Sequence, residues 1–363
     1  MKFTFIAGAR PNFMKIAPII HAIQKAQQNG ANIYYRIVHT GQHYDRNMSS
    51  TFFEELAIPH PDSNLGCGGG TQAEQTGAIM VAFEKELIAN PTDLVIVVGD
   101  VTSTMACSIV AKKLNTKVAH VEAGIRSGDL TMPEEINRMV TDALADYYFT
   151  TTELANQNLR NTGAREEQIF FVGNVMIDTL LANQHRFVKP AVFDQLRLVE
   201  KEYLMLTLHR PANVDEADKL KELMTEIVSN VHGLPVLFPI HPRTAKIFTD
   251  LGIKADNLYI VDPMGYLEFN YMVKHAKAVI TDSGGITEET TVMGIPCLTL
   301  RDNTERPETV TIGTNELVGT NPANIRPALQ KLFDGKWKKG SIPELWDGKS
   351  AERIVEKLIE IYG

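Results

Sequence analysis

The sequence predicts an α/β protein built from two Rossmann-like domains, each a doubly wound parallel sheet. Three observations predict this class: short apolar runs alternate with helix-like stretches, several runs are continuously apolar, and the pattern restarts in the second half. Continuously apolar strands are covered on both faces, and strands separated by helices pair in parallel through right-handed crossovers. A length of 363 residues suits two domains.

The first half of the chain supplies six predicted strands and four predicted helices. The strands are Lys2–Ala7, Ile33–His39, Leu94–Val98, Lys117–Val121, Tyr147–Thr150 and Ile169–Val172. The helices are Lys15–Gln28, Ala73–Ile88, Ser103–Leu114 and Pro133–Ala145. Proline suits the first position of the last helix, because its missing N–H has no partner there in any case.

The second half repeats the alternation. Its predicted strands are Leu204–Leu208, Val236–Ile240, Leu258–Val261, Ala278–Thr281 and Cys297–Leu300, and its helices are Glu216–Val231, Tyr266–Lys274 and Ile286–Met293. We expect a first domain over 1–175 and a second domain over 176–349. A C-terminal amphipathic helix at about 350–363 is expected to pack back on the first domain. Ligands bind at the carboxyl ends of such sheets, which favours the cleft between the domains.

Composition excludes several partners. The net charge of −8 argues against nucleic acid and anionic membranes, and no apolar run approaches the ~18 residues that cross a bilayer. Three scattered cysteines, Cys67, Cys107 and Cys297, give no disulfide framework or zinc pattern. The start is interrupted too soon by Arg10 to resemble a signal peptide, so we expect a cytoplasmic protein.

The common cofactor motifs are missing from the sequence. It has no G-x-G-x-x-G after a strand, no Walker A loop, no HExxH and no D-x-D pair. The glycines at 66 and 68–70 precede a helix with no predicted strand before them, which favours a plain loop. We therefore expect no cofactor and no metal, which disfavours a dehydrogenase and a metal-dependent transferase.

Positive side chains follow three of the predicted strands. Arg10 and Lys15 lie near a helix N-terminus, where cations oppose the helix dipole and an anionic ligand would reverse that penalty. Two strands of the second half end in a histidine with an arginine nearby, at His209-Arg210 and at His241. Two such ends in an acidic chain favour phosphate binding over a structural role.

The segment TDSGGITEE, from Thr281, gives the sharpest pattern: a strand, a hydroxyl, two glycines and then a helix. The backbone N–H groups of Ser283, Gly284 and Gly285 can meet a phosphate with no Cβ in the way, and the helix dipole favours the charge. Glu289 is placed to accept both ribose hydroxyls, and Arg306 follows the next strand. The alternative is an ordinary capped helix.

Carboxylates end two strands of the first half and begin a helix. Asp100 follows Leu94–Val98 and is either a helix cap or a functional group. Glu122 lies at a strand end, where a buried carboxylate requires a task. Glu134 and Arg138 are four residues apart on a helix, and spacing alone favours a surface ion pair between them.

Together these segments resemble a known family. GxRPxxxK from Gly8, GDxTS, HVEAGxRxGD, PEExNR, HR, HP, TDSGGxxEE and RDxTERPE occur in order, from Lys2 to about Gly319. The chain thus resembles the non-hydrolysing UDP-N-acetylglucosamine 2-epimerases of bacterial type. The resemblance implies a GT-B-like fold, a homodimer and no cofactor. It also implies reversible conversion of UDP-N-acetylglucosamine to UDP-N-acetylmannosamine, by elimination of UDP to a 2-acetamidoglucal and re-addition.

The resemblance also implies roles for individual residues. The catalytic set would be Asp100, Glu122, Glu134, His209, Arg10 and Lys15. The substrate- or UDP-binding set would be Arg10, Arg138, Arg210, His241, Phe269, Ser283, Gly284, Gly285, Glu289 and Arg306. A possible allosteric set for a second substrate molecule is Gln42, His43 and Gln72. Ala9, Asn12, Val101 and Leu208 depart from the usual family residues.

Three other activities are compatible with parts of the pattern. A hydrolysing 2-epimerase would release free N-acetylmannosamine, and a GT-B glycosyltransferase would have no use for three carboxylates on the first domain. A non-catalytic nucleotide-sugar-binding regulator requires those carboxylates to be only caps and ion pairs. A modified UDP-sugar, such as a diacetamido-uronic acid nucleotide, is an alternative substrate.

Overall fold

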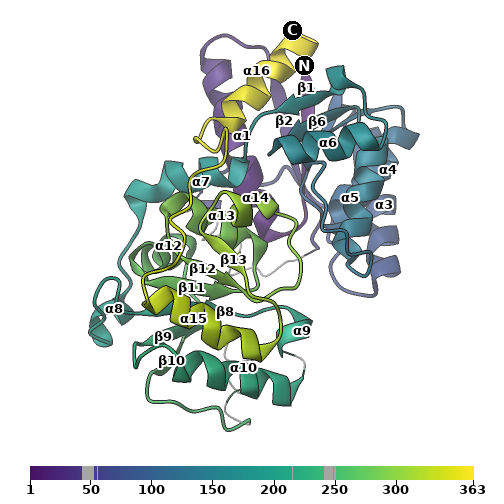
Figure 1. Ribbon diagram of the computed structural model, residues 1–363. Helices are drawn as coiled ribbons and strands as arrows, with labels where there is room; N and C mark the ends of the chain where they lie inside the picture. Colours follow the sequence, from purple (N-terminus) through teal and green to yellow (C-terminus); the bar gives the residue numbers. More distant parts are fainter. Residues whose placement is uncertain (43–52, 55, 215, 241–247, 249–250) are drawn as a thin grey trace. The chain divides into compact units, whose positions relative to one another are not determined.

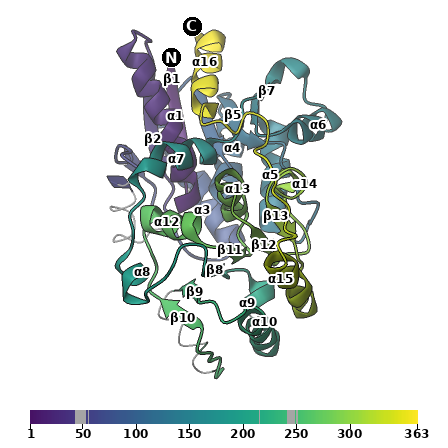
Figure 2. The ribbon, with the colours of Figure 1, turned by 60° about the vertical axis from the view of Figure 1, so that its left-hand side comes forward.

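The computed structural model describes residues 1–42, 53–54, 56–214, 216–240, 248 and 251–363 (Figures 1 and 2). The chain forms two compact units, one of Met1–Ala182 with Glu344–Gly363 and one of Asn183–Pro343. Each unit contains one parallel sheet flanked by helices, so the predicted fold class is confirmed. Among the described residues, no helix combines the length and apolarity that crossing a membrane requires.

The first unit is a seven-stranded parallel sheet in the order β3-β2-β1-β4-β5-β6-β7. Its strands are β1 (Lys2–Ala7), β2 (Tyr34–His39), β3 (Ser63–Asn64), β4 (Leu94–Val98), β5 (Lys117–Ala123), β6 (Tyr147–Thr150) and β7 (Ile169–Phe171). Its helices are α1 (Arg10–Gln28), α3 (Gln72–Ala89), α4 (Thr102–Lys113), α5 (Pro133–Leu144), α6 (Glu153–Asn161), α7 (Val175–Asn183) and α16 (Ser350–Tyr362). Strand order reverses between β1 and β4, which opens a crevice at their carboxyl ends.

The second unit repeats this topology with six strands, in the order β10-β9-β8-β11-β12-β13. The strands are β8 (Leu204–Thr207), β9 (Val236–Pro239), β10 (Leu258–Val261), β11 (Ala278–Thr281), β12 (Cys297–Thr299) and β13 (Asn315–Leu317). The helices are α8 (Ala191–Gln195), α9 (Pro211–Val214), α10 (Ala217–Ser229), α12 (Tyr266–His275), α13 (Gly284–Met293), α14 (Pro307–Thr311) and α15 (Ile325–Phe333). The corresponding reversal lies between β8 and β11.

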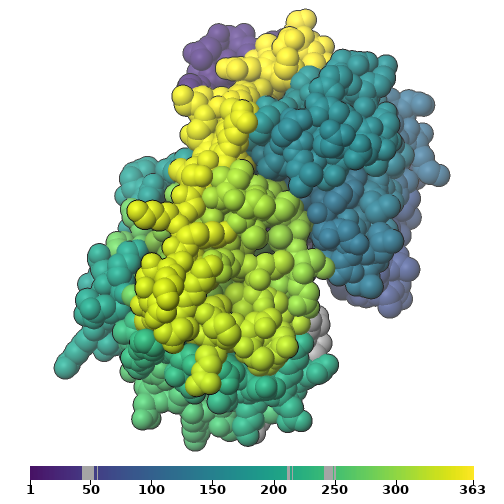
Figure 3. All heavy atoms as spheres, in the orientation of Figure 1, coloured from purple at the N-terminus to yellow at the C-terminus, as the bar shows by residue number. Residues whose placement is uncertain are grey.

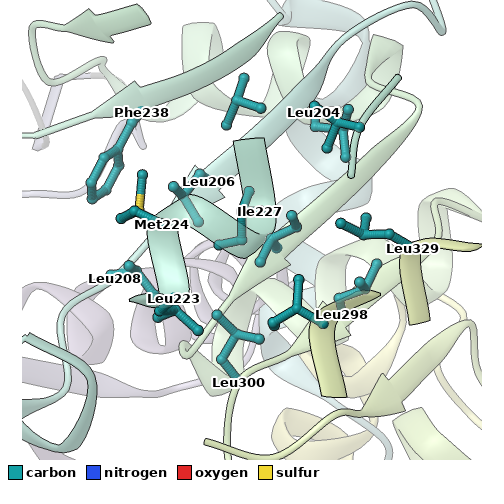
Figure 4. Packing of buried hydrophobic residues seen from close by; sticks show 14 of the residues in the cluster. Leu204, Leu206, Leu208, Leu223, Met224, Ile227, Phe238, Leu298, Leu300 and Leu329 are labelled. Atoms are coloured by element: carbon teal, nitrogen blue, oxygen red, sulfur yellow. The ribbon is translucent and has the colours of Figure 1, made fainter. Parts of the chain in front are cut away.

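A continuous apolar core holds the second unit together. Leucines of β8 and of the β12 end pack with Met224 and Ile227 of α10 and with Phe238 of β9 (Figure 4). All of these side chains are buried. The central strands are therefore fixed, and the loops at their carboxyl ends start from rigid positions.

The C-terminal helix α16 packs beside α1 in the first unit, as the views agree (Figures 1, 2 and 3). Asp178 of α7 accepts a hydrogen bond of 2.6 Å from the N–H of Ala351, at the start of α16. Thr179 of α7 donates to the carbonyl of Met14 in α1. These contacts tie α7 to the first unit, so the units divide at 182/183 and 343/344, compared with the predicted 175/176 and 349/350.

Several features differ from the sequence prediction. A short strand, β3, does precede the glycine-rich segment at 66–70, and β13 follows β12. Both have only two or three residues, too few to show a pattern. Helix α1 begins at Arg10 rather than Lys15, because Pro11 favours a helix start.

Candidate active site

The crevice of the first unit is organised by Asn12. Its Oδ1 accepts hydrogen bonds from the N–H groups of Gly8 (3.0 Å) and Ala9 (2.9 Å), and its Nδ2 donates to the carbonyl of Val98 (2.9 Å). The side chain therefore fixes the turn after β1 against the end of β4. An amide can donate and accept at once, which an ionised carboxylate at this position cannot.

Glu122 and Lys15 form an ion pair at the carboxyl edge of the sheet. The Lys15 Nζ lies 2.5 Å from Glu122 Oε2, and the exposed fractions of the two side chains are 13% and 2%. Glu122 has a φ of 68°, where the register between β5 and β6 shifts. A glutamate in the left-handed region is strained, which is typical of functional positions.

Gly99 makes room for this ion pair. Its φ is also positive, at 68°. A Cβ at this position would lie 3.0 Å from Lys15 Nζ and 3.5 Å from Glu122 Oε2. Glycine is therefore required both by the backbone conformation and by the approach of the two charged groups.

Asp100, which follows Gly99, pairs with Arg138. Its Oδ2 accepts from Arg138 Nη2 (2.6 Å) and Nε (3.1 Å), while Arg138 Nη1 donates to Glu135 (2.6 Å). Val101, not Asp100, occupies the cap position of α4. The arginine thus links a buried carboxylate on α5 to the carboxylate at the end of β4.

Spacing favoured an ion pair between Glu134 and Arg138, and the structure has different partners. The guanidinium points to Glu135 and Asp100. Within the described residues no hydrogen bond or ion pair involves Glu134, whose side chain is half-buried at the start of α5. Its carboxylate is left available for another role.

Behind these groups lies a second layer of polar side chains. His120 is fully buried on β5, with Nδ1 2.6 Å from Asp142 and Nε2 2.9 Å from the carbonyl oxygen of Gly99. Burial acts to raise the pKa of Asp142, but its interactions with His120 and Arg126 outweigh this, and the pKa lies below its ordinary value. The layer supports the turn that carries Asp100.

Two residues of the predicted allosteric set contact the helix that follows Asp100. Ser103 Oγ donates to Gln42 Oε1 over 2.9 Å, and Thr102 Oγ1 donates to Gln72 Oε1 over 3.4 Å. His43 lies outside the described residues. Arg10 is the first residue of α1 and has an exposed side chain.

In the second unit, Asp282 organises the crevice between β8 and β11. This buried carboxylate accepts from the backbone N–H groups of His209 (3.0 Å) and Arg210 (2.9 Å) and from Asn213. The Arg210 Nε donates to the carbonyl of Asp282 over 3.1 Å. The predicted His209-Arg210 pair is therefore fixed to the TDSGG segment, while His241 lies outside the described residues.

The N-terminus of α13 lacks the cap that an ordinary helix would have. Ser283 is the cap residue, but its side chain makes no capping hydrogen bond, and the first turn has no acidic residue. The next two residues are Gly284 and Gly285. The first turn of α13 therefore receives no hydrogen bond from a capping side chain.

Glu289, one turn into α13, is buried and accepts a hydrogen bond of 2.9 Å from the Tyr266 hydroxyl. Burial raises its pKa to about 7. Arg306 Nε pairs with Glu288 over 2.7 Å, and Phe269 packs at the edge of an apolar cluster around α12. Helix α13 thus brings two glutamates to the interior of the second unit.

Several polar residues that sequence patterns alone do not single out belong to these arrangements: Asn12, His120, Glu135, Asp142, Asp282 and Arg301. All are buried, and each holds a backbone group or a charged side chain near a strand end. A polar residue inside an otherwise apolar strand, such as His120, or directly after one, such as Asp282, is the signal that marks some of them. No group of three or more potential metal ligands occurs among the described residues.

Comparison with known proteins gives consistent matches. Residues 25–359 match the family model described as UDP-N-acetylglucosamine 2-epimerase. The chain is 42% identical to the UDP-N-acetylglucosamine 2-epimerase of Methanocaldococcus jannaschii, over 99% of both chains. The crystal structure of that organism's enzyme in complex with UDP-GlcNAc and UDP has a TM-score of 0.87 over all of both chains. A UDP-2,3-diacetamido-2,3-dideoxy-D-glucuronate 2-epimerase of Pseudomonas aeruginosa is 39% identical, over 99% of this chain and 100% of its own.

Proposed function

The chain belongs to the UDP-N-acetylglucosamine 2-epimerase family, and we propose that it interconverts UDP-N-acetylglucosamine and UDP-N-acetylmannosamine by inverting C2. The observation that carries the proposal is the Lys15–Glu122 pair, a buried carboxylate in a strained backbone position at a strand end. Such a position is costly for a purely structural glutamate and suits a proton-transfer group.

The reaction needs acid–base groups and a held leaving group. The proton at C2 is not adjacent to a carbonyl, so its removal is coupled to departure of UDP from C1. A carboxylate takes the proton, the C–H electrons form the C1–C2 double bond, and the C1–O electrons leave with UDP. Return of a proton to the opposite face of C2 and re-addition of UDP at C1 complete the inversion.

The first unit supplies the proton-transfer groups in this proposal. Asp100, Glu122 and Glu134 are the acid–base carboxylates. Lys15 Nζ lies 2.5 Å from the Glu122 carboxylate, and Arg138 Nη2 lies 2.6 Å from the Asp100 carboxylate. Arg10, exposed at the start of α1, is assigned to the substrate phosphates.

The second unit supplies the nucleotide-binding groups. Ser283, Gly284 and Gly285 are assigned to the diphosphate at the N-terminus of α13, where Gly284 and Gly285 offer their N–H groups and the Ser283 N–H donates to Thr281 Oγ1. Glu289 accepts the ribose hydroxyls. His209 and Arg210, whose backbone N–H groups are held by Asp282, are assigned to the leaving diphosphate. His241, Phe269 and Arg306 complete the proposed set.

The similarity to the Pseudomonas enzyme makes UDP-2,3-diacetamido-2,3-dideoxy-D-glucuronate a second candidate substrate. Parallel assays of both nucleotide sugars by proton NMR decide between them. We expect UDP-N-acetylmannosamine to form from UDP-N-acetylglucosamine at the higher kcat/KM. Release of free N-acetylmannosamine as the main product would instead show hydrolysis.

Substitution of Glu122 by Gln tests the assigned chemistry. The amide keeps the shape of the side chain but cannot accept the proton, so we expect turnover to fall by about 100-fold or more, with UDP affinity retained. Glu86→Gln is the control, because Glu86 is also an ion-paired glutamate of the first unit with little exposure. Equal turnover of Glu122→Gln and wild type would make Glu122 structural.

The proposal also includes a homodimer in the cytoplasm. The dimer follows from the family resemblance. Cys107 and Cys297, buried and unpaired, suit a reducing compartment. Light scattering coupled to size-exclusion chromatography tests the dimer, and cell fractionation tests the location.

A further inference from the structure

Arg301, which follows β12, has a guanidinium that is only partly satisfied. Its side chain is 3% exposed. Nη2 donates to Glu305 Oε2 over 2.6 Å and to Asn303 over 3.2 Å. Nε and Nη1 are buried and have no hydrogen-bond partner within the described part of the chain. Buried polar groups almost always have partners, so two unused donors on one cation indicate an acceptor that arrives with a ligand.

The Nη1 donor lies beside the N-terminal end of α13. A Cβ built on Gly284 would be 3.8 Å from Arg301 Nη1 and 2.8 Å from Glu305 Oε1. The guanidinium and the carboxylate therefore share the space next to the first residue of the helix. That helix end has no side-chain cap.

Charge and geometry favour an anion with several oxygens in this space. A helix N-terminus and an arginine both attract negative charge. The planar guanidinium binds phosphate oxygens through a pair of parallel N–H donors, and Nη1 and Nη2 form such a pair once Glu305 leaves Nη2. The Glu305 carboxylate already places one negative charge next to both the Arg301 guanidinium and the N-terminus of α13. It lies on the loop between β12 and α14 and is four residues from Arg301, so a modest side-chain rotation would release the space.

We propose that Arg301 is a diphosphate-binding residue and that Glu305 occupies the phosphate position when no nucleotide is bound. Binding of the nucleotide then exchanges one anion for another at the same guanidinium. Arg301 acts in addition to Arg306, whose Nε pairs with Glu288. The identity of the nucleotide as UDP rests on the proposed function, while the anion site rests on the geometry of the second unit.

The exchange has a consequence that separates it from a structural ion pair. Removing Arg301 takes away a ligand of the diphosphate and weakens binding. Removing the charge of Glu305 takes away a competing anion and strengthens binding. If the pair only stabilised the loop, loss of either partner would disturb the site in the same direction.

Isothermal titration calorimetry on the full chain tests this consequence. We expect Arg301→Gln to weaken UDP binding by at least tenfold and to change uridine binding less than twofold. We expect Glu305→Gln to strengthen UDP binding about threefold. Arg36→Gln is the matched control, because Arg36 is also a poorly exposed, ion-paired arginine, paired with Glu86 in the first unit; it is expected to bind UDP as wild type does.

Two results would overturn the inference: UDP affinity unchanged in Arg301→Gln, or affinity lost together in Arg301→Gln and Glu305→Gln. Should Arg301→Gln fail to fold by circular dichroism, Arg301→Lys keeps the charge without the two-donor fork, and an affinity equal to wild type would have the same meaning. Inorganic pyrophosphate is titrated in parallel. If Arg301→Gln weakens pyrophosphate binding but the wild-type protein does not epimerise, the proposed function is rejected and this inference stands. If the protein is an epimerase whose UDP and pyrophosphate affinities are unchanged in Arg301→Gln, this inference is rejected and the proposed function stands.

Discussion

At the residue scale, the proposed chemistry depends on one strained position and its neighbour. Glu122 and Gly99 both adopt positive φ, at 68° each, and the two chain segments meet at Lys15. The left-handed conformation costs an L-residue about 1–2 kcal/mol. This free-energy cost is present at Glu122, whose carboxylate is paired with Lys15.

Substitution of Gly99 by Ala tests how closely the ion pair is held. The new Cβ would lie 3.0 Å from Lys15 Nζ, so the Lys15–Glu122 pair must shift. The alanine must also adopt the strained left-handed backbone conformation. We expect kcat to fall at least tenfold and the free energy of unfolding to fall by about 1–2 kcal/mol.

Gly233→Ala is the control for Gly99→Ala. Gly233 also has a positive φ, of 75°, but a Cβ there would have no neighbour within 4 Å. It should lose similar stability and keep full activity. Similar activity in the two variants would contradict a role for the space at Gly99.

Glu289 predicts a pH dependence of stability. Its pKa is about 7 in the folded chain, against an ordinary value of 4.5, so the folded state holds the proton more tightly than the unfolded state. Protonated Glu289 therefore contributes to the free energy of unfolding below pH ~4.5. This contribution, on the order of 3 kcal/mol, is lost as the pH rises to about 7.

Urea unfolding of wild type and Glu289→Gln between pH 4.5 and 8 measures how the free energy of unfolding depends on Glu289. In the variant this free energy should lack the decline with rising pH that is due to Glu289, and the variant should be more stable than wild type at pH 8. Parallel pH profiles in the two proteins would show that Glu289 does not titrate in this range.

At the element scale, long apolar runs were predicted well and short or tertiary features were not. β1, β4, β6, β10 and β11 have the predicted bounds, because each is a largely apolar run between turn residues. β3 and β13 are too short for any period. The partner of Arg138 also escaped prediction, because helical spacing offers Glu134 and Glu135 alike and only the position of Asp100 on the neighbouring strand decides.

The docking of α16 gives a prediction at this scale. Asp178→Ala removes the acceptor of the Ala351 N–H and leaves that buried donor without a partner. We expect the free energy of unfolding to fall by about 1–3 kcal/mol. Glu360→Gln, which removes an exposed ion pair from the same helix, should change it by less than about 0.5 kcal/mol. Equal effects in denaturant unfolding would contradict the role of Asp178.

At the scale of the whole molecule, the same strand order occurs twice and serves two purposes. In the first unit the ends of β4 and β5 carry ion-paired carboxylates, and in the second the ends of β8 and β11 carry backbone donors and cations. The motifs could be located from the sequence because they follow strands. The buried partners that hold these motifs, such as Asp282 and Arg301, could be identified only from the fold. The contacts of Asp282 join segments distant in the chain, and those of Arg301 lie within one loop.

The most direct test of the central claim is conversion of UDP-N-acetylglucosamine in heavy water, followed by proton NMR. Inversion by proton removal and return predicts UDP-N-acetylmannosamine with deuterium at C2 of both nucleotide sugars, and loss of this exchange in Glu122→Gln. An absence of deuterium at C2 in both sugars, with the wild-type protein folded and binding UDP, would contradict the account.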